Sequence, residues 1–320
     1  MNLKEYLKTS TIRPQEGDKV EYMSFQRRMI SNVLVNSQRL TPGVGCSYDA
    51  DVTKLIEEYK KLKSTCGYDL TFNTIMLKVL VECLKAAPKL NAHFLYNHFS
   101  GNGKLIIKKH IDVSIAINLD NDQTFQVKVM NLEEKNLKET AFLAEEAKRK
   151  LRNTKLDDIM FEVARQRIIG LIIHGHLLSP ICQTIMACFG KGKAISLTKS
   201  LKSDFRKLMK KEKIEDTLKM KELNEGSVCF TNWGTLYDDL DVNITYIPPL
   251  YPQVFMFGMG RVKDVDFVYK DEEDNLQMGT KKILPLSLIF DHKIGGATDL
   301  MPFIKKLDEI LKNPEIIHTW

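Results

Sequence analysis

The chain lacks the cysteine pattern of a disulfide-bonded protein. It has six cysteines in 320 residues, and no two of them form a Cys-x-x-Cys pair. Small secreted domains are held by dense disulfides, whereas scattered cysteines in apolar surroundings are typical of reduced compartments. The first residues also lack the charged and apolar regions of a signal peptide. We therefore expect a cytoplasmic protein with free thiols.

Several motifs of nucleotide and metal chemistry are also missing. No Gly-x-Ser-x-Gly elbow is present, and Gly258-Met-Gly260 is not followed by a helix that could bind a phosphate. Gly101-Asn-Gly103 is typical of a hairpin turn. Four residues fit no standard zinc spacing: His174, His176, Cys182 and Cys188. We expect neither a nucleotide site nor a bound metal.

Positive charge is concentrated in one segment. The net charge is +6, and residues 191–221 hold eleven lysines and arginines against four acids. The remainder is nearly neutral, so the sequence does not indicate nucleic-acid binding.

Residues 168–190 contain no charged side chain, which is close to the length of a membrane span. Pro180 and three glycines favour instead a broken pair of helices packed on the protein. We predict that residues 160–225 form a helical insertion, partly apolar and partly basic. Peripheral membrane contact through 165–223 is the alternative to a solvated basic face.

Hydrophobic periodicity predicts an α/β protein. Helical spacing covers residues 24–38, 51–62, 71–87, 137–151 and 298–311. Strand-like runs cover 44–52, two parts of 104–119, 227–231, 253–262 and 283–290. Because helices and strands alternate without a repeat or a low-complexity linker, we expect one domain over residues 1–320.

His292 is the most informative side chain. It follows the apolar run 283–290 and Asp291, and a predicted helix comes next. An imidazole at the exit of a buried strand can act as a base with a fixed tautomer. The alternative is a histidine in a strand-to-helix turn with no chemical role.

Four blocks in order resemble the catalytic domain of the 2-oxoacid dehydrogenase acyltransferases, the dihydrolipoamide acyltransferase family. They are residues 24–31, then 51–55 with 84–92, then 227–234, and finally 291–297. The resemblance implies the two-layer α/β sandwich of the coenzyme A-dependent acyltransferases, which is chloramphenicol acetyltransferase-like. It also implies a homotrimer whose active sites lie at the subunit interfaces.

The same resemblance implies acyl transfer between thiols. His292 would be the general base, and Thr231, at the place of the family's serine, would stabilise the oxyanion. Arg27, Asn232 and Asp291 would support the site, and Asn91 and Gly234 would contact the substrate. Coenzyme A would be a substrate, a lipoyl group would come from a separate lipoyl or acyl carrier protein, and no metal is implied.

The sequence departs from the family at three places. Gly296 replaces the aspartate four residues after the histidine, which leaves Arg27 without the family's partner. We also expect a stand-alone form, without a lipoyl or a peripheral-subunit-binding domain before the match, and an insertion at 160–225. Two alternatives therefore stand beside a thioester-dependent acyltransferase. One is a non-catalytic scaffold homologue, and the other is a membrane-surface acyltransferase that acts on a lipid or envelope acceptor.

Overall fold

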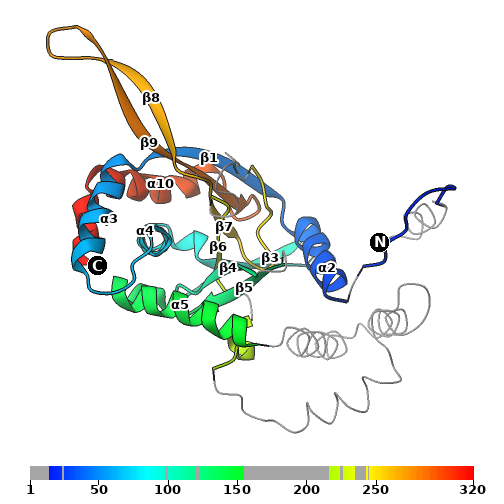
Figure 1. Cartoon of the computed structure of the whole chain (residues 1–320). Coiled ribbons are helices and arrows are strands. Elements are labelled where there is room, and N and C mark those ends of the chain that lie inside the picture. The colour runs from blue at the N-terminus through cyan, green and yellow to red at the C-terminus, as the bar shows by residue number, and fades with distance from the viewer. Residues whose placement is uncertain are drawn as a thin grey trace. The chain divides into compact units, whose positions relative to one another are not determined.

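A computed structural model of the chain describes residues 14–23, 25–97, 100–119, 123–154, 216–223, 226–234, 243 and 245–320 (Figure 1). The chain folds into two compact units. The first comprises Met1–Asn32 and Leu156–Lys213, and the second comprises Val33–Lys155 and Ile214–Trp320. Most of the predicted insertion lies outside the described residues. Its boundaries, and the single domain over 1–320, stay predictions.

A mixed sheet of seven strands forms the centre of the second unit. The strand order is β1-β9-β7-β6-β4-β5, and β8 pairs with β9. The chain runs parallel from β4 to β6 and from β6 to β7, and the other pairs are antiparallel. The strands are β1 (Gly43–Asp51), β4 (Val113–Leu119), β5 (Gln123–Val129), β6 (Val228–Asn232), β7 (Phe255–Met259), β8 (Lys263–Lys270) and β9 (Leu276–Asp291). A separate hairpin consists of β2 (Ala92–Asn97) and β3 (Asn102–Ile107).

Helices cover one face of this sheet. The α-helices are α2 (Phe25–Leu40), α3 (Thr53–Thr65), α4 (Phe72–Ala86), α5 (Leu137–Asn153), α9 (Met220–Leu223) and α10 (Ala297–Lys312). Short 3₁₀ helices are η1 (Pro88–Leu90), η2 (Leu132–Glu134) and η3 (Pro314–Thr319). On α10, Phe303 packs against Phe255 and Phe257 of β7, with ring centroids 5.1 and 6.1 Å apart. α4 packs against both α10 and α5, so these helices form the second layer of an α/β sandwich.

Local sequence signals explain where the helices begin and end. Thr71 caps α4 by accepting a hydrogen bond from the Thr74 N–H, and the helix ends just before Pro88. Asn136 and Glu139 form a reciprocal capping box at the start of α5. The helices predicted at these places are therefore confirmed.

The remaining predictions hold for most strands and fail for three. β1, β6, β7 and the buried part of β9 overlap the runs predicted as strands, and the predicted turn at Gly101–Gly103 joins β2 to β3. β2, β5 and β8 were not predicted, and β9 begins at Leu276 instead of 283. These strands mix polar and apolar residues, so cross-strand pairing stabilises them more than their own hydrophobicity. Residues 14–23 contain no strand.

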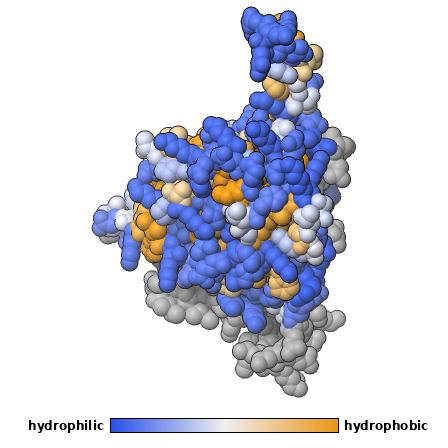
Figure 2. Space-filling model, turned by 90° about the vertical axis from the view of Figure 1, so that its left-hand side faces the viewer, coloured by the Kyte–Doolittle hydropathy of each residue, from blue (hydrophilic) through white to orange (hydrophobic). Residues whose placement is uncertain are grey.

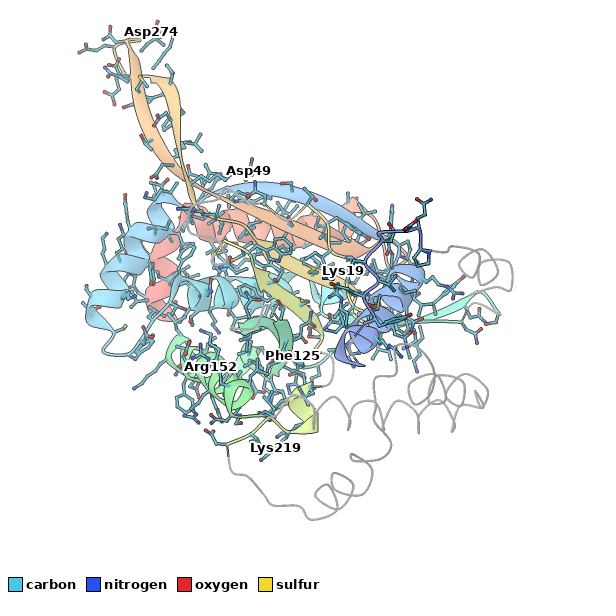
Figure 3. All side chains as sticks on the ribbon, turned by 45° about the vertical axis from the view of Figure 1, so that its right-hand side comes forward. Lys19, Asp49, Phe125, Arg152, Lys219 and Asp274 are labelled. Atoms are coloured by element: carbon cyan, nitrogen blue, oxygen red, sulfur yellow. The ribbon has the colours of Figure 1, made fainter. Side chains whose placement is uncertain are left out.

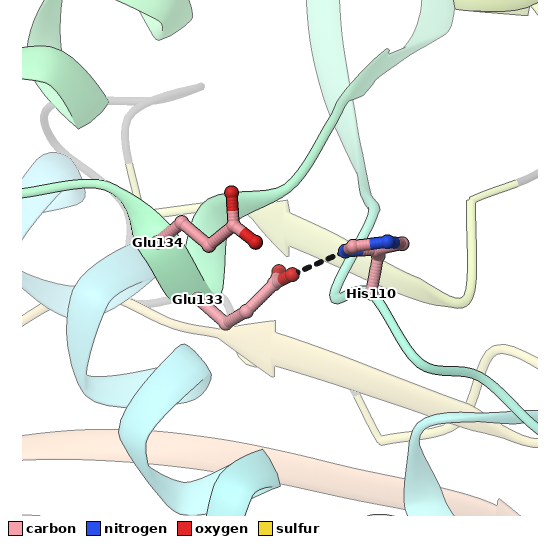
Figure 4. Close-up of side chains that lie close together, drawn as sticks. All are labelled: His110, Glu133 and Glu134. Atoms are coloured by element: carbon pink, nitrogen blue, oxygen red, sulfur yellow. Dashed lines mark hydrogen bonds and ion pairs between the residues drawn. The ribbon is translucent and has the colours of Figure 1, made fainter.

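Glu133 ties the loop before β4 to the loop after β5. Its Oε1 lies 2.6 Å from His110 Nδ1, and its Oε2 accepts a hydrogen bond of 2.8 Å from the Ile111 N–H (Figure 4). Burial alone would raise the pKa of this carboxyl. The hydrogen bonds from Ile111 and His110 outweigh that effect, so the pKa lies below its ordinary value of 4.5.

We predict that Glu133→Gln costs about 1–2 kcal/mol of unfolding free energy at pH 7, because a charge-assisted hydrogen bond is lost. A depressed carboxyl pKa stabilises the fold above the unfolded pKa, and the contribution disappears as pH falls through the folded pKa. The difference from wild type should therefore shrink as the pH drops below 4.5. Urea unfolding at a series of pH values measures it.

Glu134→Gln is the matched control, because this neighbouring carboxyl is exposed. It should change stability little at any pH. A Glu133→Gln deficit that stays constant down to acidic pH would contradict the assigned role.

Candidate functional site

His292 lies one residue beyond the end of β9. Its N–H donates to the Pro42 carbonyl at 2.9 Å, which continues the pairing of β1 with β9. Its Nδ1 lies 2.9 Å from the Gly295 carbonyl oxygen. Because a carbonyl only accepts, Nδ1 carries the proton of the neutral ring and Nε2 keeps its lone pair. The side chain is exposed, so Nε2 is an accessible base with a fixed tautomer.

Asp291 and Lys293 hold the turn on both sides of His292. Asp291 is 1% exposed, accepts the Lys293 N–H at 3.0 Å, and lies 3.1 Å from the Lys293 ammonium. Burial raises the pKa of Asp291 above its ordinary value, although Lys293 opposes the shift. The ammonium also contacts the Leu40 carbonyl and lies 5.1 and 5.4 Å from the ring centroids of Phe94 and Tyr96. The turn is thereby joined to the end of α2 and to the β2–β3 hairpin.

Thr231 lies on β6 and is 7% exposed. The strand register places it level with Gly258 on β7, and through Gly258 with Ser287 on β9. His292 is five residues further along the β9 direction and two strands away. At about 3.3 Å per residue and about 4.8 Å between strands, the two residues lie on the order of 20 Å apart. One chain therefore does not bring the predicted base and the predicted oxyanion donor together.

Asn232 and Gly234 shape the end of β6. The Asn232 amide donates to the Asn73 side chain at 2.6 Å, and its oxygen accepts the Gly234 N–H at 2.8 Å. A Cβ at Gly234 would collide with the Gly260 carbonyl, so only glycine allows this close approach. The predicted roles of the two residues, site support and substrate contact, stay predictions.

Asn91 is buried and immediately precedes β2. Its amide donates to the carbonyls of Lys108 and His110, both at 3.1 Å, and its oxygen has no hydrogen-bond partner in the described part of the chain. This geometry supports a structural role, and its predicted substrate contact stays a prediction. Arg27 lies on α2 within the first unit, so its predicted support of His292 also stays a prediction.

Gly296 begins α10 and has space for a side chain. Its φ of −112° suits any residue, and a Cβ there would meet no atom within 4 Å. Its N–H donates to Asp299 at 3.1 Å, and Asp299 pairs with Lys89 at 2.8 Å. The hydrogen bond from Lys89, together with that from the Gly296 N–H, lowers the pKa of Asp299. Crowding therefore does not explain why glycine stands at position 296, where the family has an aspartate. Asp291 and Asp299 are engaged with Lys293 and Lys89, respectively.

The described residues offer one group of donors for a metal. Atoms of His110, Glu133 and Glu134 lie within 4.8 Å of one another (Figure 4). The hydrogen bonds to Glu133 described above use His110 Nδ1 and both Glu133 oxygens, so this group is explained by its structural role. His174, His176, Cys182 and Cys188, at which no metal site is expected, lie outside the described part of the chain.

Two buried thiols, those of Cys83 and Cys229, are not activated nucleophiles. Burial raises the pKa of Cys229 to about 12 and also raises the pKa of Cys83. A thiol must ionise to attack, so these two buried cysteines are inert.

Within the described residues, no helix is both long and apolar enough to cross a bilayer.

Two contacts at the site were not predicted from the sequence. Phe94 and Tyr96 are two residues apart on β2, so their rings lie on the same face and could share a partner. That partner is Lys293, which is far away in the sequence. The Tyr246 ring lies against Gly43 of β1, where an added Cβ would be 2.6 Å from the tyrosine hydroxyl. No local pattern indicates this contact.

Comparison with known proteins identifies the family. The sequence model of the 2-oxoacid dehydrogenases acyltransferase (catalytic domain) matches residues 15–161 and 196–319. The chain belongs to this family. The resemblance based on four sequence blocks is therefore confirmed over most of the chain.

Curated relatives of this acyltransferase-family chain are longer proteins. A dihydrolipoyllysine-residue acetyltransferase component of the pyruvate dehydrogenase complex from Acholeplasma laidlawii is 22% identical over 95% of the chain and 43% of its own length. A lipoamide acyltransferase component of the branched-chain alpha-keto acid dehydrogenase complex from Bacillus subtilis is 28% identical over 44% of the chain and 32% of its length. The chain thus spans less than half of these relatives.

Solved structures confirm the fold. The cubic core of the pyruvate dehydrogenase complex matches with a TM-score of 0.61 at 18% identity, covering 96% of this chain and 98% of that one. The catalytic core from Thermoplasma acidophilum matches with a TM-score of 0.60 at 17% identity, covering 93% and 99%. A third structure, of Azotobacter vinelandii dihydrolipoamide acetyltransferase, has a TM-score of 0.61 at 18% identity and the same coverage as the first. That structure was used to study the role of a serine, a histidine and an asparagine in the catalytic mechanism of that enzyme, and the histidine and asparagine are four positions apart.

We predict that Gly295→Ala and Gly296→Ala differ in stability. A methyl group at 295 would collide with the Asp299 carboxylate, which caps α10 and pairs with Lys89, whereas 296 is open. Gly295→Ala should lose about 1–2 kcal/mol, the usual range for a damaged helix cap, and Gly296→Ala should lose little. Urea unfolding measures both. A larger loss for Gly296→Ala would show that the local geometry is wrong.

Proposed function

We propose that this chain transfers an acyl group from a thioester donor to an acceptor thiol or hydroxyl, with His292 as the general base. The observation that carries the proposal is the hydrogen bond between His292 Nδ1 and the Gly295 carbonyl. It presents Nε2 as an accessible base on an ordered turn, in a chain whose family consists of acyltransferases.

His292 Nε2 and the Thr231 hydroxyl account for the steps of the transfer. Nε2 takes the proton of the acceptor thiol, whose unperturbed pKa of about 8.5 leaves it mostly protonated at neutral pH. The thiolate attacks the thioester carbonyl, which forms a new C–S bond and a tetrahedral oxyanion. The Thr231 hydroxyl donates a hydrogen bond to this oxyanion. The intermediate then collapses, the original C–S bond breaks, and Nε2 returns the proton to the departing thiolate.

Each site needs two copies of the chain. In one chain, His292 and Thr231 are on the order of 20 Å apart along the rigid sheet, so a base and a donor that act on one carbonyl come from different copies. A closed ring in which His292 of each copy meets Thr231 of the next satisfies this requirement. A homotrimer with three interface sites is the form that the family resemblance implies.

The donor class follows from the relatives. Their names refer to acetyl or acyl transfer on lipoyl groups. We propose acyl-coenzyme A or an acyl-lipoyl group on a separate carrier protein as donor. A non-catalytic scaffold is the contrasting function, and the observation that favours it is Gly296 with Asp291 and Asp299 already paired elsewhere.

We predict that His292→Ala and Thr231→Val each abolish most acyl transfer from acetyl-coenzyme A to dihydrolipoamide. Removal of a general base typically costs about 10²–10⁴ in rate, and removal of an oxyanion donor about 10²–10³. Chains of both variants, co-expressed with different tags and purified through both, should recover activity. In a trimer that contains both variants, about one in three sites keeps both groups, because its intact histidine and its intact threonine come from neighbouring copies.

His318→Ala is the control, since this histidine pairs with Glu58 and lies outside the proposed site. It should keep wild-type activity. Mixed assemblies without recovered activity would refute the divided site. A folded wild-type assembly that transfers no acyl group and binds no coenzyme A would establish the scaffold function instead.

A further inference from the structure

Lys293 is largely enclosed, although its neighbour His292 is exposed. The side chain of Lys293 is 19% exposed, whereas that of Lys61 on α3 is 67% exposed. The face that carries α3 is mostly hydrophilic, as expected where lysines stay in water (Figure 2). An enclosed lysine loses hydration and side-chain freedom, so it needs specific partners to hold it in place.

Four groups from three parts of the chain surround the Lys293 ammonium. The Asp291 carboxylate lies 3.1 Å away, and the Leu40 carbonyl at the end of α2 accepts a hydrogen bond from the ammonium. The rings of Phe94 and Tyr96 are stacked on each other, with centroids 6.3 Å apart, and offer one aromatic surface to the charge. Figure 3 shows the β2–β3 hairpin beside α2, where these groups meet.

The same residue is tied to the start of the turn. Asp291 accepts the Lys293 N–H with one oxygen and faces the ammonium with the other. The Asp291 N–H donates to the Val254 carbonyl at 2.8 Å, and the Asp291 carbonyl accepts the Ile294 N–H at 3.1 Å. The backbone is therefore restrained on both sides of His292.

The proton position on the imidazole depends on this turn. The Gly295 carbonyl, which accepts from Nδ1 of His292, comes only two residues after Lys293. The Phe290 ring lies edge-on to the imidazole at 6.1 Å and confines it from the strand side. If Lys293 moves, the Gly295 carbonyl moves with it, and either ring nitrogen can then carry the proton.

We propose that Lys293 is a positioning residue for the His292 base. Its enclosed ammonium keeps the Gly295 carbonyl against Nδ1 and thereby leaves the lone pair on Nε2. The inference rests on the proposed function, in which Nε2 takes the proton of the acceptor. This arrangement orders the base without the acid that the family has at position 296.

Three variants of the full chain test this role. Lys293→Met keeps the length and the apolar stem of the side chain but removes the charge. Lys293→Arg keeps a cation that can donate to the same oxygens and stack on the rings. Asp291→Asn combined with Lys293→Met removes both charges, so no unpaired carboxylate stays buried, and the asparagine oxygen can still accept the N–H of residue 293.

Lys306→Met is the matched control. Lys306 is also partly enclosed, with a 26% exposed side chain, and it pairs with Glu309 on α10, outside the turn. This variant should match wild type in every measurement.

Two measurements separate positioning from substrate binding. ¹⁵N NMR of histidine-labelled protein reports which ring nitrogen carries the proton, and His292→Ala identifies the signal. Kinetics with acetyl-coenzyme A and dihydrolipoamide give kcat and KM. Lys293→Met should lower kcat about 10–10²-fold with unchanged KM, because the base is displaced while the substrates still bind. It should also lose the preference for the Nδ1–H tautomer. The double variant should show the same losses, and Lys293→Arg should restore most of both.

The remaining outcomes overturn the proposal or the function beneath it. Wild-type kcat and tautomer in Lys293→Met, or in the double variant if the single variant does not fold, would overturn the role of Lys293. So would a raised KM with unchanged kcat, which assigns Lys293 to binding, or a lost kcat with an unchanged tautomer. A wild type that transfers no acyl group would instead refute the proposed function, and the tautomer in the variants would still decide whether Lys293 positions the ring.

Discussion

The pairing of β9 with β1 and β7 is the interaction on which the rest of the structure depends. One continuous strand of 16 residues pairs with β8 along its first half and carries the His292 turn after its last residue. The β1 pairing extends to the hydrogen bond between His292 and Pro42, so the backbone of the base is fixed by the sheet. Because backbone ladders allow no slip without moving side chains to the other face, this register also sets the distance between His292 and Thr231.

A buried ion pair then fixes the turn that follows the strand. Asp291 is almost inaccessible, and its charge is compensated by the ammonium and the N–H of Lys293. Removing one partner of such a pair leaves an uncompensated charge, which is why the two residues act as a unit. The same ammonium lies over Phe94 and Tyr96, so the β2–β3 hairpin supports the turn from outside the main sheet. The site is thus held by contacts from three distant parts of the sequence.

Much of the fold could be predicted from local patterns. The helices at α4 and α5 follow from apolar periodicity with caps at Thr71 and Asn136, and the buried end of β9 follows from its continuous apolar run. β8 could not be predicted in this way. It mixes charged and apolar residues in a hairpin that is largely exposed, and only its pairing with β9 makes it a strand. Asn91 similarly matched a family position, yet the role of its buried amide depends on carbonyls 17 and 19 residues away.

The sequence by itself determined the main helices, several of the strands, the family and the presence of a histidine at a strand exit, because these depend on local propensities and short motifs. Only the tertiary structure decided which nitrogen of His292 is basic, which partners Asp291 and Asp299 take, and that position 296 has room for the missing acid. It also decided that His292 and Thr231 do not meet in one chain. The separation of these two residues arises from the register between strands far apart in sequence, and no local pattern encodes that register.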